Sequence, residues 1–304
     1  MLFLLLWEFG QLDDMELRVH IMKKEKRSVR ANLSLTIVAT LLEIHLFWAL
    51  TAAALTPPDL ELWRLDCGQF VNLSVEDMSD TFAYQGQRKT LSNGCYLIRH
   101  GGEYMLWDTG FSAATIERYN ASQMGATMPT SLPNQLARIG IEPKRVTVIG
   151  VSHYHGDHTG QASLFPWARL LIGKQDFELL VQRKSPDITP WTQEKANLEL
   201  ISGDKDVFGD GSVIMLGTPG HTLGHHSLLV HLPKSGVIIL TGDLWHFTDQ
   251  VNRNEMPQGT ADRAANLASR ERITRIAANL KATIIIQHET SDIPKLPALP
   301  VSAR

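Results

Sequence analysis

Residues 152–160 have the sequence SHYHGDHTG, in which His153, His155, Asp157 and His158 bring three imidazoles and one carboxylate within six positions. Imidazoles and carboxylates are ligands that divalent transition metals prefer. His153 and His155 are two residues apart, so in an extended segment their side chains project to the same side and can hold one ion. Asp157 and His158 come where the chain turns, so they face elsewhere and suit a second ion.

The apolar run that precedes this cluster predicts a rigid support for it. Val146–Val151 is short and rich in β-branched residues, which is typical of a buried strand. A polar loop that is merely rich in histidine is the ordinary alternative. Four ligand-type residues directly after a buried strand favour a metal site instead.

Three further potential ligands each follow another apolar run. They are His221 after Val213–Leu216, Asp243 after Val237–Leu240, and His288 after Ala282–Ile286. Taken alone, each of the three residues is weak evidence for a metal site, and His288 is equally well explained as a core or surface histidine. Strand ends at one edge of a sheet converge, so we expect these three side chains to meet the His-rich loop.

The size, charge and cysteine content of the chain limit the classes of protein to which it can belong. The chain has 304 residues, 43% of them hydrophobic, and a formal net charge of −3. This size suits one large domain or two small ones, and the charge gives no sign of a nucleic-acid surface. The two cysteines, Cys67 and Cys95, have no metal-type spacing. A disulfide between them and two buried free thiols are both compatible with the sequence, and we favour the free thiols slightly.

The N-terminal part has the order of a secretory signal peptide. A basic cluster at residues 23–30 precedes an apolar stretch at 33–50 and then Ala52–Ala54, an A-x-A cleavage pattern. Glu43 interrupts the apolar stretch, and Met22 rather than Met1 is a candidate start. We expect an N-terminal extension over 1–54 and an exported protein, periplasmic or secreted, whose mature chain, 55–304, forms a single hydrolase domain. Membrane anchoring through 33–50 is the alternative.

The remaining sequence predicts two similar halves, each made of strands followed by a helix and a strand. We expect strands over Leu60–Cys67, Cys95–Arg99, Tyr104–Trp107, Val146–Val151, Arg169–Ile172, Val213–Leu216, His226–His231, Val237–Leu240 and Ala282–Ile286, helices over Ser131–Ile139, Gln175–Gln182 and Ala261–Leu280, and irregular loops over Gly68–Thr90 and Lys184–Thr192. Two sheets flanked by helices satisfy this pattern.

The complete ligand pattern resembles that of the metallo-β-lactamase fold hydrolases. The resemblance runs from about Leu60 to His288, and the spacing of the later ligands resembles the N-acyl homoserine lactonase branch. It implies an α/β fold, a four-layer αββα sandwich with two mixed sheets. It also implies that His153, His155 and His221 bind one metal, that Asp157, His158 and His288 bind another, and that Asp243 bridges them. Asp108, in the turn Trp107–Gly110, would orient the His-rich loop without binding metal.

Five imidazoles with carboxylates and no thiolate suggest two zinc ions, although iron, cobalt and manganese fit such ligands. Two close metals can share a hydroxide that is nucleophilic at neutral pH. The resemblance therefore implies lactone opening by a metal-bridging hydroxide, with Asp157 passing a proton to the leaving alkoxide. The partner would be a small-molecule ester, with no nucleic acid, and a homodimer is common in this branch.

One position departs from the lactonase pattern. Many lactonases carry a tyrosine three residues after the bridging aspartate, where this chain has His246. Imidazole can also donate a hydrogen bond to a substrate carbonyl, so lactone opening stays compatible. We read the neighbouring His225, His226 and His231 as structural or solvent-facing.

The alternative hydrolases would use the same metal site on a different substrate. An exported phosphotriesterase or arylesterase resembling methyl parathion hydrolase is the second hypothesis. A glyoxalase II-like thioesterase and a β-lactamase are less favoured, because the first needs a helical C-terminal domain and the second a Cys or Ser near the bridging position. A metal-storage or electron-transfer protein is the non-enzymatic hypothesis. Phe70, Phe82 and Tyr84 suit either an apolar substrate pocket or core packing.

Overall fold

The computed structural model of this chain describes Met22 and residues 59–304, and residues from Pro58 to Arg304 form one compact unit. The predicted signal peptide, its cleavage site and the anchoring stretch lie outside the described residues. Within the described part of the chain, the model contains no helix with the length and hydrophobicity needed to cross a membrane.

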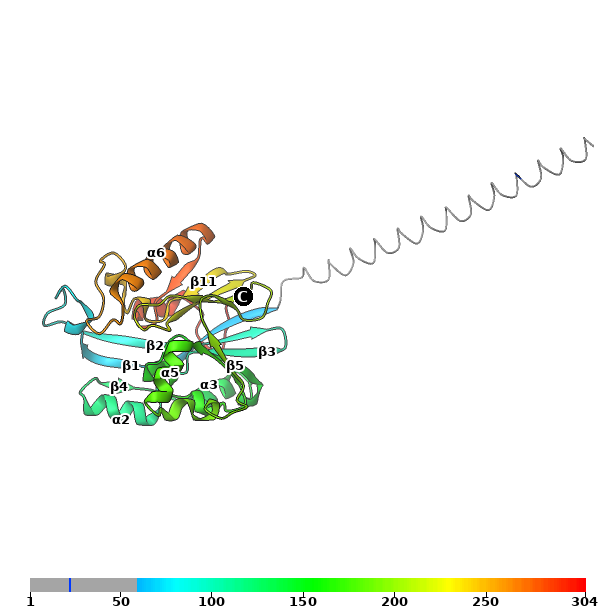
Figure 1. Ribbon diagram of the computed structural model, residues 1–304, viewed down its shortest axis with the longest axis horizontal. Coiled ribbons are helices and arrows are strands. Elements are labelled where there is room, and N and C mark those ends of the chain that lie inside the picture. The colour runs from blue at the N-terminus through cyan, green and yellow to red at the C-terminus, as the bar shows by residue number, and fades with distance from the viewer. Residues whose placement is uncertain (1–21, 23–58) are drawn as a thin grey trace, which may run out of the picture. The chain divides into compact units, whose positions relative to one another are not determined.

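Two β-sheets pack face to face and helices cover their outer faces (Figure 1). The strands are β1 (Leu60–Ser74), β2 (Arg88–His100), β3 (Glu103–Trp107), β4 (Ala126–Thr127), β5 (Val146–Val151), β6 (Arg169–Gly173), β7 (Leu198–Ile201), β8 (Lys205–Asp206), β9 (Val213–Gly217), β10 (His226–Leu232), β11 (Gly236–Leu240) and β12 (Thr283–Ile285). The α-helices are α2 (Ala113–Ala121), α3 (Leu132–Arg138), α4 (Gly156–Thr159), α5 (Lys174–Gln182) and α6 (Arg263–Leu280).

The seven-stranded sheet has the order β4-β1-β2-β3-β5-β6-β7, and the five-stranded sheet has the order β12-β11-β10-β9-β8. Both are mixed, because β3, β5, β6 and β7 run parallel within the first and β11 and β12 run parallel within the second. Figure 1 shows α6 over the outer face of the five-stranded sheet and α2 and α3 on the far side of the other sheet. The predicted αββα sandwich is confirmed.

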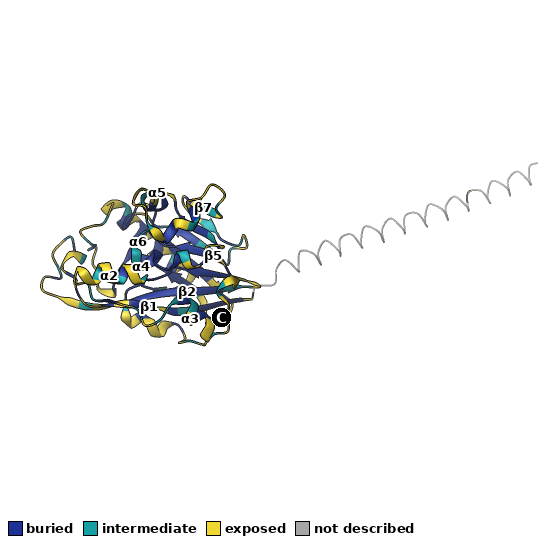
Figure 2. Ribbon diagram, turned by 90° about the horizontal axis from the view of Figure 1, so that it is seen from below, coloured by how far each residue is buried: buried dark blue, intermediate teal, exposed yellow. Residues whose placement is uncertain are grey.

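Strand alternation divides the core into layers. Leu228 and Val230 of β10 point between the two sheets, and Leu229 points outward against Ile273 of α6. In β2 the alternation sends Ile98 between the sheets. Buried residues therefore fill both faces of the central strands, as the dark ribbons of Figure 2 show.

Some elements differ from the sequence-based expectation. The segment Gly68–Thr90, predicted to be irregular, contains the end of β1 and the beginning of β2. Two register shifts in β1, between Asp66 and Gln69 and between Phe70 and Leu73, break the alternation that would have revealed the strand. Helix α2 was not predicted, because Thr115 is its only buried residue and it has no apolar stripe.

Two further differences follow from partners that sequence patterns do not reveal. Arg270 of α6 is buried, although arginine is usually exposed on a helix, and it donates to the carbonyl oxygens of Leu244 and Glu255. The residues Lys184–Thr192, predicted to form a loop, contain a 3-10 helix over Pro186–Trp191.

The two cysteines form a disulfide, so the slight preference for free thiols was wrong. Cys67 and Cys95 lie on neighbouring strands β1 and β2, with their Cα atoms 5.7 Å apart. Both are fully buried, and Gly110 packs so closely against Cys67 that a Cβ there would lie 2.5 Å from the Cys67 Cβ. The bridge therefore sits directly behind the turn that carries Asp108.

Candidate metal centre

Four strand ends bring the predicted ligands to one edge of the sandwich. The loop after β5 carries His153 and His155, and α4 carries Asp157 and His158. The loops after β9, β11 and β12 carry the other three, His221, Asp243 and His288. All seven are buried or half-buried, and their ligand atoms fall into two groups of metal-binding size.

The first group contains three imidazole nitrogens that face one another. His153 Nε2 lies 2.8 Å from His155 Nδ1 and 3.2 Å from His221 Nε2, and the last two atoms are 3.1 Å apart. Nitrogens bound to one tetrahedral zinc ion at its usual bond length are separated by about 3.3 Å. The three rings therefore stand at the spacing of ligands around a single ion.

The second group is built from Asp157, His158 and His288. Asp157 Oδ2 lies 3.4 Å from His158 Nε2 and 3.5 Å from His288 Nε2. The other ring nitrogen of each histidine is already used, since His158 Nδ1 donates to Asp108 and His288 Nδ1 donates to the Ser92 carbonyl. Each Nε2 thus faces the centre, where it is available to a metal ion.

Asp243 stands between the two groups. Its Oδ2 lies 3.6 Å from His153 Nε2 and 3.5 Å from His221 Nε2. Its Oδ1 lies 3.2 Å from His158 Nε2 and 3.1 Å from His288 Nε2. One carboxylate oxygen for each group is the arrangement of a bridging ligand.

The protonation states suit a cation on the first group. Burial lowers the pKa of His153 and His221 well below the usual value and that of His155 to about 4. Burial also disfavours charge on His158, but nearby Asp243, Asp157 and Asp108 outweigh it and raise that pKa well above the usual value. These carboxylates therefore favour positive charge in the second group, which a divalent metal ion would supply.

The donor atoms themselves show that the residues fit metal ions. Among the described residues, His158 Nε2 and Asp243 Oδ1 are buried and have no hydrogen-bond partner. Buried polar atoms are rarely left unpaired, and three lone pairs facing one another in the first group repel unless a cation lies between them. Two divalent ions would satisfy both groups, with Asp243 shared.

A match to a family model covers residues 90–288, and that model describes the metallo-beta-lactamase superfamily. This chain belongs to that superfamily. Among curated relatives, an N-acyl homoserine lactonase from Bacillus sp is 29% identical over 213 residues, covering 67% of this chain and 84% of the relative. The N-acyl homoserine lactonase AttM of Azorhizobium caulinodans is 28% identical over 176 residues, covering 55% of this chain and 66% of the relative.

Solved structures agree on the superfamily fold. An N-acyl homoserine lactone hydrolase, with the product N-hexanoyl-L-homoserine bound at its catalytic metal center, has a TM-score of 0.67 and 24% identity, covering 80% of this chain and 98% of its own. AidC, a dizinc quorum-quenching lactonase, has a TM-score of 0.59 and 18% identity, covering 78% of this chain and 90% of its own.

Asp108 lies behind the centre and contacts the start of the His-rich loop. Its Oδ1 accepts from the Ser152 backbone N–H at 2.7 Å, and its Oδ2 accepts from Ser152 Oγ and His158 Nδ1, both at 2.9 Å. It is fully buried and has a φ of 56°. This left-handed turn aims the carboxylate across the start of the His-rich loop.

Asp176, at the start of α5, is a supporting residue that sequence analysis missed. Its Oδ2 accepts from the Tyr154 backbone N–H and from Thr222 Oγ1, and its Oδ1 accepts from the Gly224 N–H. It therefore ties the loop of His155 to the loop of His221. Burial raises its pKa to about 6, despite these hydrogen bonds. A lone aspartate in a helix carries no sequence signal of this role.

His225 also acts behind the centre, as the structural interpretation expected. Its Nε2 accepts from the Asp243 backbone N–H at 3.0 Å, and its Nδ1 donates to the Thr218 carbonyl. It thus fixes the loop that carries the bridging carboxylate. The ring nitrogens of His226 face two backbone carbonyls and His231 is exposed, so neither reaches the centre.

His246 lies at the centre itself. Its Nε2 is 3.3 Å from Asp243 Oδ2, and its ring stacks on that of His288 with centroids 5.7 Å apart. Its Nδ1 is buried without a hydrogen-bond partner in the described chain. The structure therefore places this ring where it can contact either a metal ion or a ligand.

An apolar cavity of about 300 Å³ opens onto the metal groups. Its apolar lining includes Phe70, Leu73, Met78, Leu91 and Met124. Of the three aromatic residues considered from sequence, only Phe70 lines it. Phe82 is 66% exposed, and Tyr84 packs on Phe247 with its hydroxyl bonded to Glu255.

Proposed function

We propose that this chain is a dinuclear-metal hydrolase that opens the ring of N-acyl homoserine lactones. The observation that carries the proposal is the pair of ligand groups sharing Asp243 beneath an apolar cavity. The curated relatives named N-acyl homoserine lactonase support the choice of substrate. An acyl chain supplies the apolar surface that such a cavity would bury.

When bound, two divalent ions supply a nucleophilic hydroxide and polarise the ester carbonyl. His153, His155 and His221 would hold one ion, Asp157, His158 and His288 the other, and Asp243 both. The donors are nitrogen and oxygen only, which favours zinc, with iron, cobalt and manganese compatible.

Asp157 is the residue proposed to carry the proton. The imidazoles of His158 and His288 overcome the effect of burial and lower its pKa to about 2, so its carboxylate is ionised at neutral pH. Asp157 Oδ1 lies 3.4 Å from the Tyr119 hydroxyl, and Oδ2 faces the centre. It can accept the proton of the attacking water and return it to the leaving ring oxygen.

His246 is proposed to contact the substrate carbonyl or its developing oxyanion. His246 lines the apolar cavity, and its Nε2 is the ring atom that faces the centre, 3.3 Å from Asp243 Oδ2. An imidazole N–H there could donate to a substrate oxygen. This histidine is also the observation that favours the second candidate, a phosphotriesterase or arylesterase with the same centre. Where many lactonases have a tyrosine, an imidazole could donate to an acyl or to a phosphoryl oxygen, which leaves room for this second substrate class.

The decisive experiment offers N-hexanoyl homoserine lactone to the zinc-loaded protein and follows proton release. We expect lactone opening that is abolished by a chelator, restored by zinc and lost in His155→Ala and Asp157→Asn. His231→Ala serves as the control, because that histidine is exposed. Turnover of paraoxon or a simple aryl ester without lactone opening would contradict the lactone assignment but would still support the metal centre.

We also propose that the mature domain begins near Leu55 after export to the periplasm or the medium, on the strength of the N-terminal sequence alone. N-terminal sequencing of protein recovered from the periplasm tests this proposal. A homodimer is proposed by analogy with the lactonase branch, and sedimentation equilibrium would test it.

A further inference from the structure

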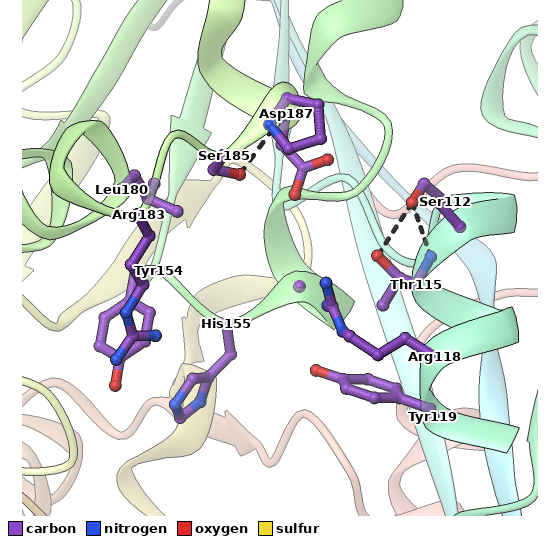
Figure 3. Close-up of a pocket in the computed structure, with 13 residues that line it drawn as sticks. Ser112, Thr115, Arg118, Tyr119, Tyr154, His155, Leu180, Arg183, Ser185 and Asp187 are labelled. Atoms are coloured by element: carbon purple, nitrogen blue, oxygen red, sulfur yellow. Dashed lines mark hydrogen bonds between the residues drawn. The ribbon is translucent and has the colours of Figure 1, made fainter. Parts of the chain in front are cut away.

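A second cavity, of about 370 Å³, adjoins the metal centre (Figure 3). Tyr119 and His155 line both this cavity and the apolar one, so the two cavities share part of their walls. The second cavity is polar where the first is apolar. Its lining includes Ser112, Ser185 and Asp187 together with two arginines, Arg118 and Arg183.

The two arginines approach His155 from different elements. Arg118 lies on α2 with its guanidinium 5.3 Å from the ring centroid of Tyr119, and Arg183 follows α5 with its guanidinium 4.7 Å from that of Tyr154. Figure 3 shows His155 between these two stacked pairs. The aromatic rings hold the guanidinium groups beside the cavity.

Neither guanidinium is neutralised by a carboxylate within the described residues. Arg169, Arg272 and Arg275 each form an ion pair within 4.0 Å, but Arg118 and Arg183 form none in that part of the chain. Both side chains are exposed, so their N–H donors remain available to a ligand that enters the cavity.

Among the described residues, Asp187 is the one acidic residue that lines the cavity, and its carboxylate is bonded to another side chain. It is buried, and its Oδ2 accepts from Thr159 Oγ1 at 2.8 Å. Burial raises its pKa, although the hydrogen bond from Thr159 and the nearby Arg118 act to lower it. The cavity thus carries two positive charges against one negative charge.

We propose that this cavity is a carboxylate-binding subsite beside the metal centre. A guanidinium matches a carboxylate with two parallel hydrogen bonds, and two guanidiniums here face one opening. The inference rests on the proposed function for one source of that carboxylate. Water adds to the ester carbon, the ring C–O bond breaks, one proton of the water passes to the ring oxygen and the other is released to solvent, so a neutral lactone becomes a carboxylate anion. A substrate that already carries a carboxylate is the other source.

The subsite can be tested by ligand binding alone, without catalysis. Binding of hexanoate and of hexanamide to the zinc-loaded protein is measured by calorimetry, for wild type, Arg118→Gln and Arg183→Gln. We expect hexanoate to bind more tightly than hexanamide in wild type, and this ratio to fall by about five- to tenfold in each variant. Arg138→Gln is the matched control, since Arg138 is exposed on α3 and lines a different cavity.

Two results would overturn the subsite: no preference for hexanoate in wild type, or the same preference in both arginine variants. The second result would mean that the carboxylate binds the metal ions alone. Because the measurement is independent of catalysis, a chain that fails to open lactones still gives a clear answer. Arg118→Lys and Arg183→Lys should each retain part of the preference for hexanoate over hexanamide, since lysine keeps the charge but lacks the paired donors.

Two further measurements separate the sources of the carboxylate. Ring-opened N-hexanoyl homoserine is tested as an inhibitor of a neutral aryl ester, and a glutarate monoester is compared as a substrate with its methyl-capped form. A higher inhibition constant in the arginine variants assigns the subsite to the product. A higher KM for the anionic ester alone assigns it to the substrate. No change in either would contradict the proposal.

Discussion

Asp108 illustrates how a residue outside the two ligand groups can govern the centre. It fixes the backbone of Ser152 and the ring of His158 at the same time. Asp108→Asn keeps the size and tolerates the positive φ, but its amide nitrogen must replace one accepting oxygen. We expect the affinity for zinc to fall by about 10–100-fold, as measured by chelator competition.

The control for that variant is Asp206→Asn, whose carboxylate also accepts backbone N–H groups but in a turn at Gly209 and Gly211. It should bind zinc like the wild type. Equal zinc affinity in Asp108→Asn and Asp206→Asn would show that the contact to His158 is dispensable.

At the residue scale, sequence reasoning reached the ligands but not all of their supports. His153, His155, Asp157 and His158 were visible because they are adjacent in the chain. Asp176 was not, because its three acceptor contacts join residues 22 to 48 positions away. Whether the Cys67 and Cys95 thiols pair depends on the register of two strands, which composition does not specify.

At the scale of elements, the close approach of β6 to the loop of His221 limits what the chain tolerates. A Cβ at Gly173 would lie 1.9 Å from the Gly224 carbonyl oxygen, which is backbone and cannot rotate away. We expect Gly173→Ala to displace that loop, to lower zinc affinity and to destabilise the fold by about 2–4 kcal/mol in urea unfolding.

Gly102→Ala is the comparison for that change, since nothing lies within 4 Å of a Cβ there. Its stability should stay within about 0.5 kcal/mol of wild type. A Gly173→Ala protein as stable as Gly102→Ala would mean that the loop adjusts freely.

Elements with an apolar periodicity were predictable and elements without one were not. The strands Val146–Val151 and Gly236–Leu240 and the helix ending at Leu280 agree with expectation within a few residues. Helix α2 carries mainly polar side chains, yet it brings Arg118 and Tyr119 to the site. This helix is held by its N-cap, Ser112, and by the packing of Ile116 and Tyr119 against the apolar cluster that contains Phe70.

At the scale of the whole molecule, protons and metal ions compete for the same buried imidazoles beside the carboxylates. His158 and His288 have raised pKa values without metal, because neighbouring carboxylates outweigh their burial. Metal binding must displace these protons, so affinity is lost as the pH falls through those raised values. We expect the apparent zinc affinity to fall by about 10–100-fold per pH unit between pH 7 and pH 5.

Calorimetry in buffers of different ionisation enthalpy would count the protons released on zinc binding. The expected release is above one proton per protein at pH 6 and decreases as the pH rises. A zinc affinity that is independent of pH would contradict the raised pKa values.

The rate at which the buried disulfide between β1 and β2 is reduced can report how often the sheet opens. Because Cys67 and Cys95 are inaccessible to solvent, a reducing agent can reach them only while the sheet is open. The rate of reduction in native buffer should therefore become independent of dithiothreitol concentration once opening limits it, and zinc should slow it by stabilising the closed form. Thiol trapping followed by mass spectrometry measures this rate. A rate proportional to dithiothreitol at all concentrations, and unaffected by zinc, would indicate that the bridge is reached without opening the sheet.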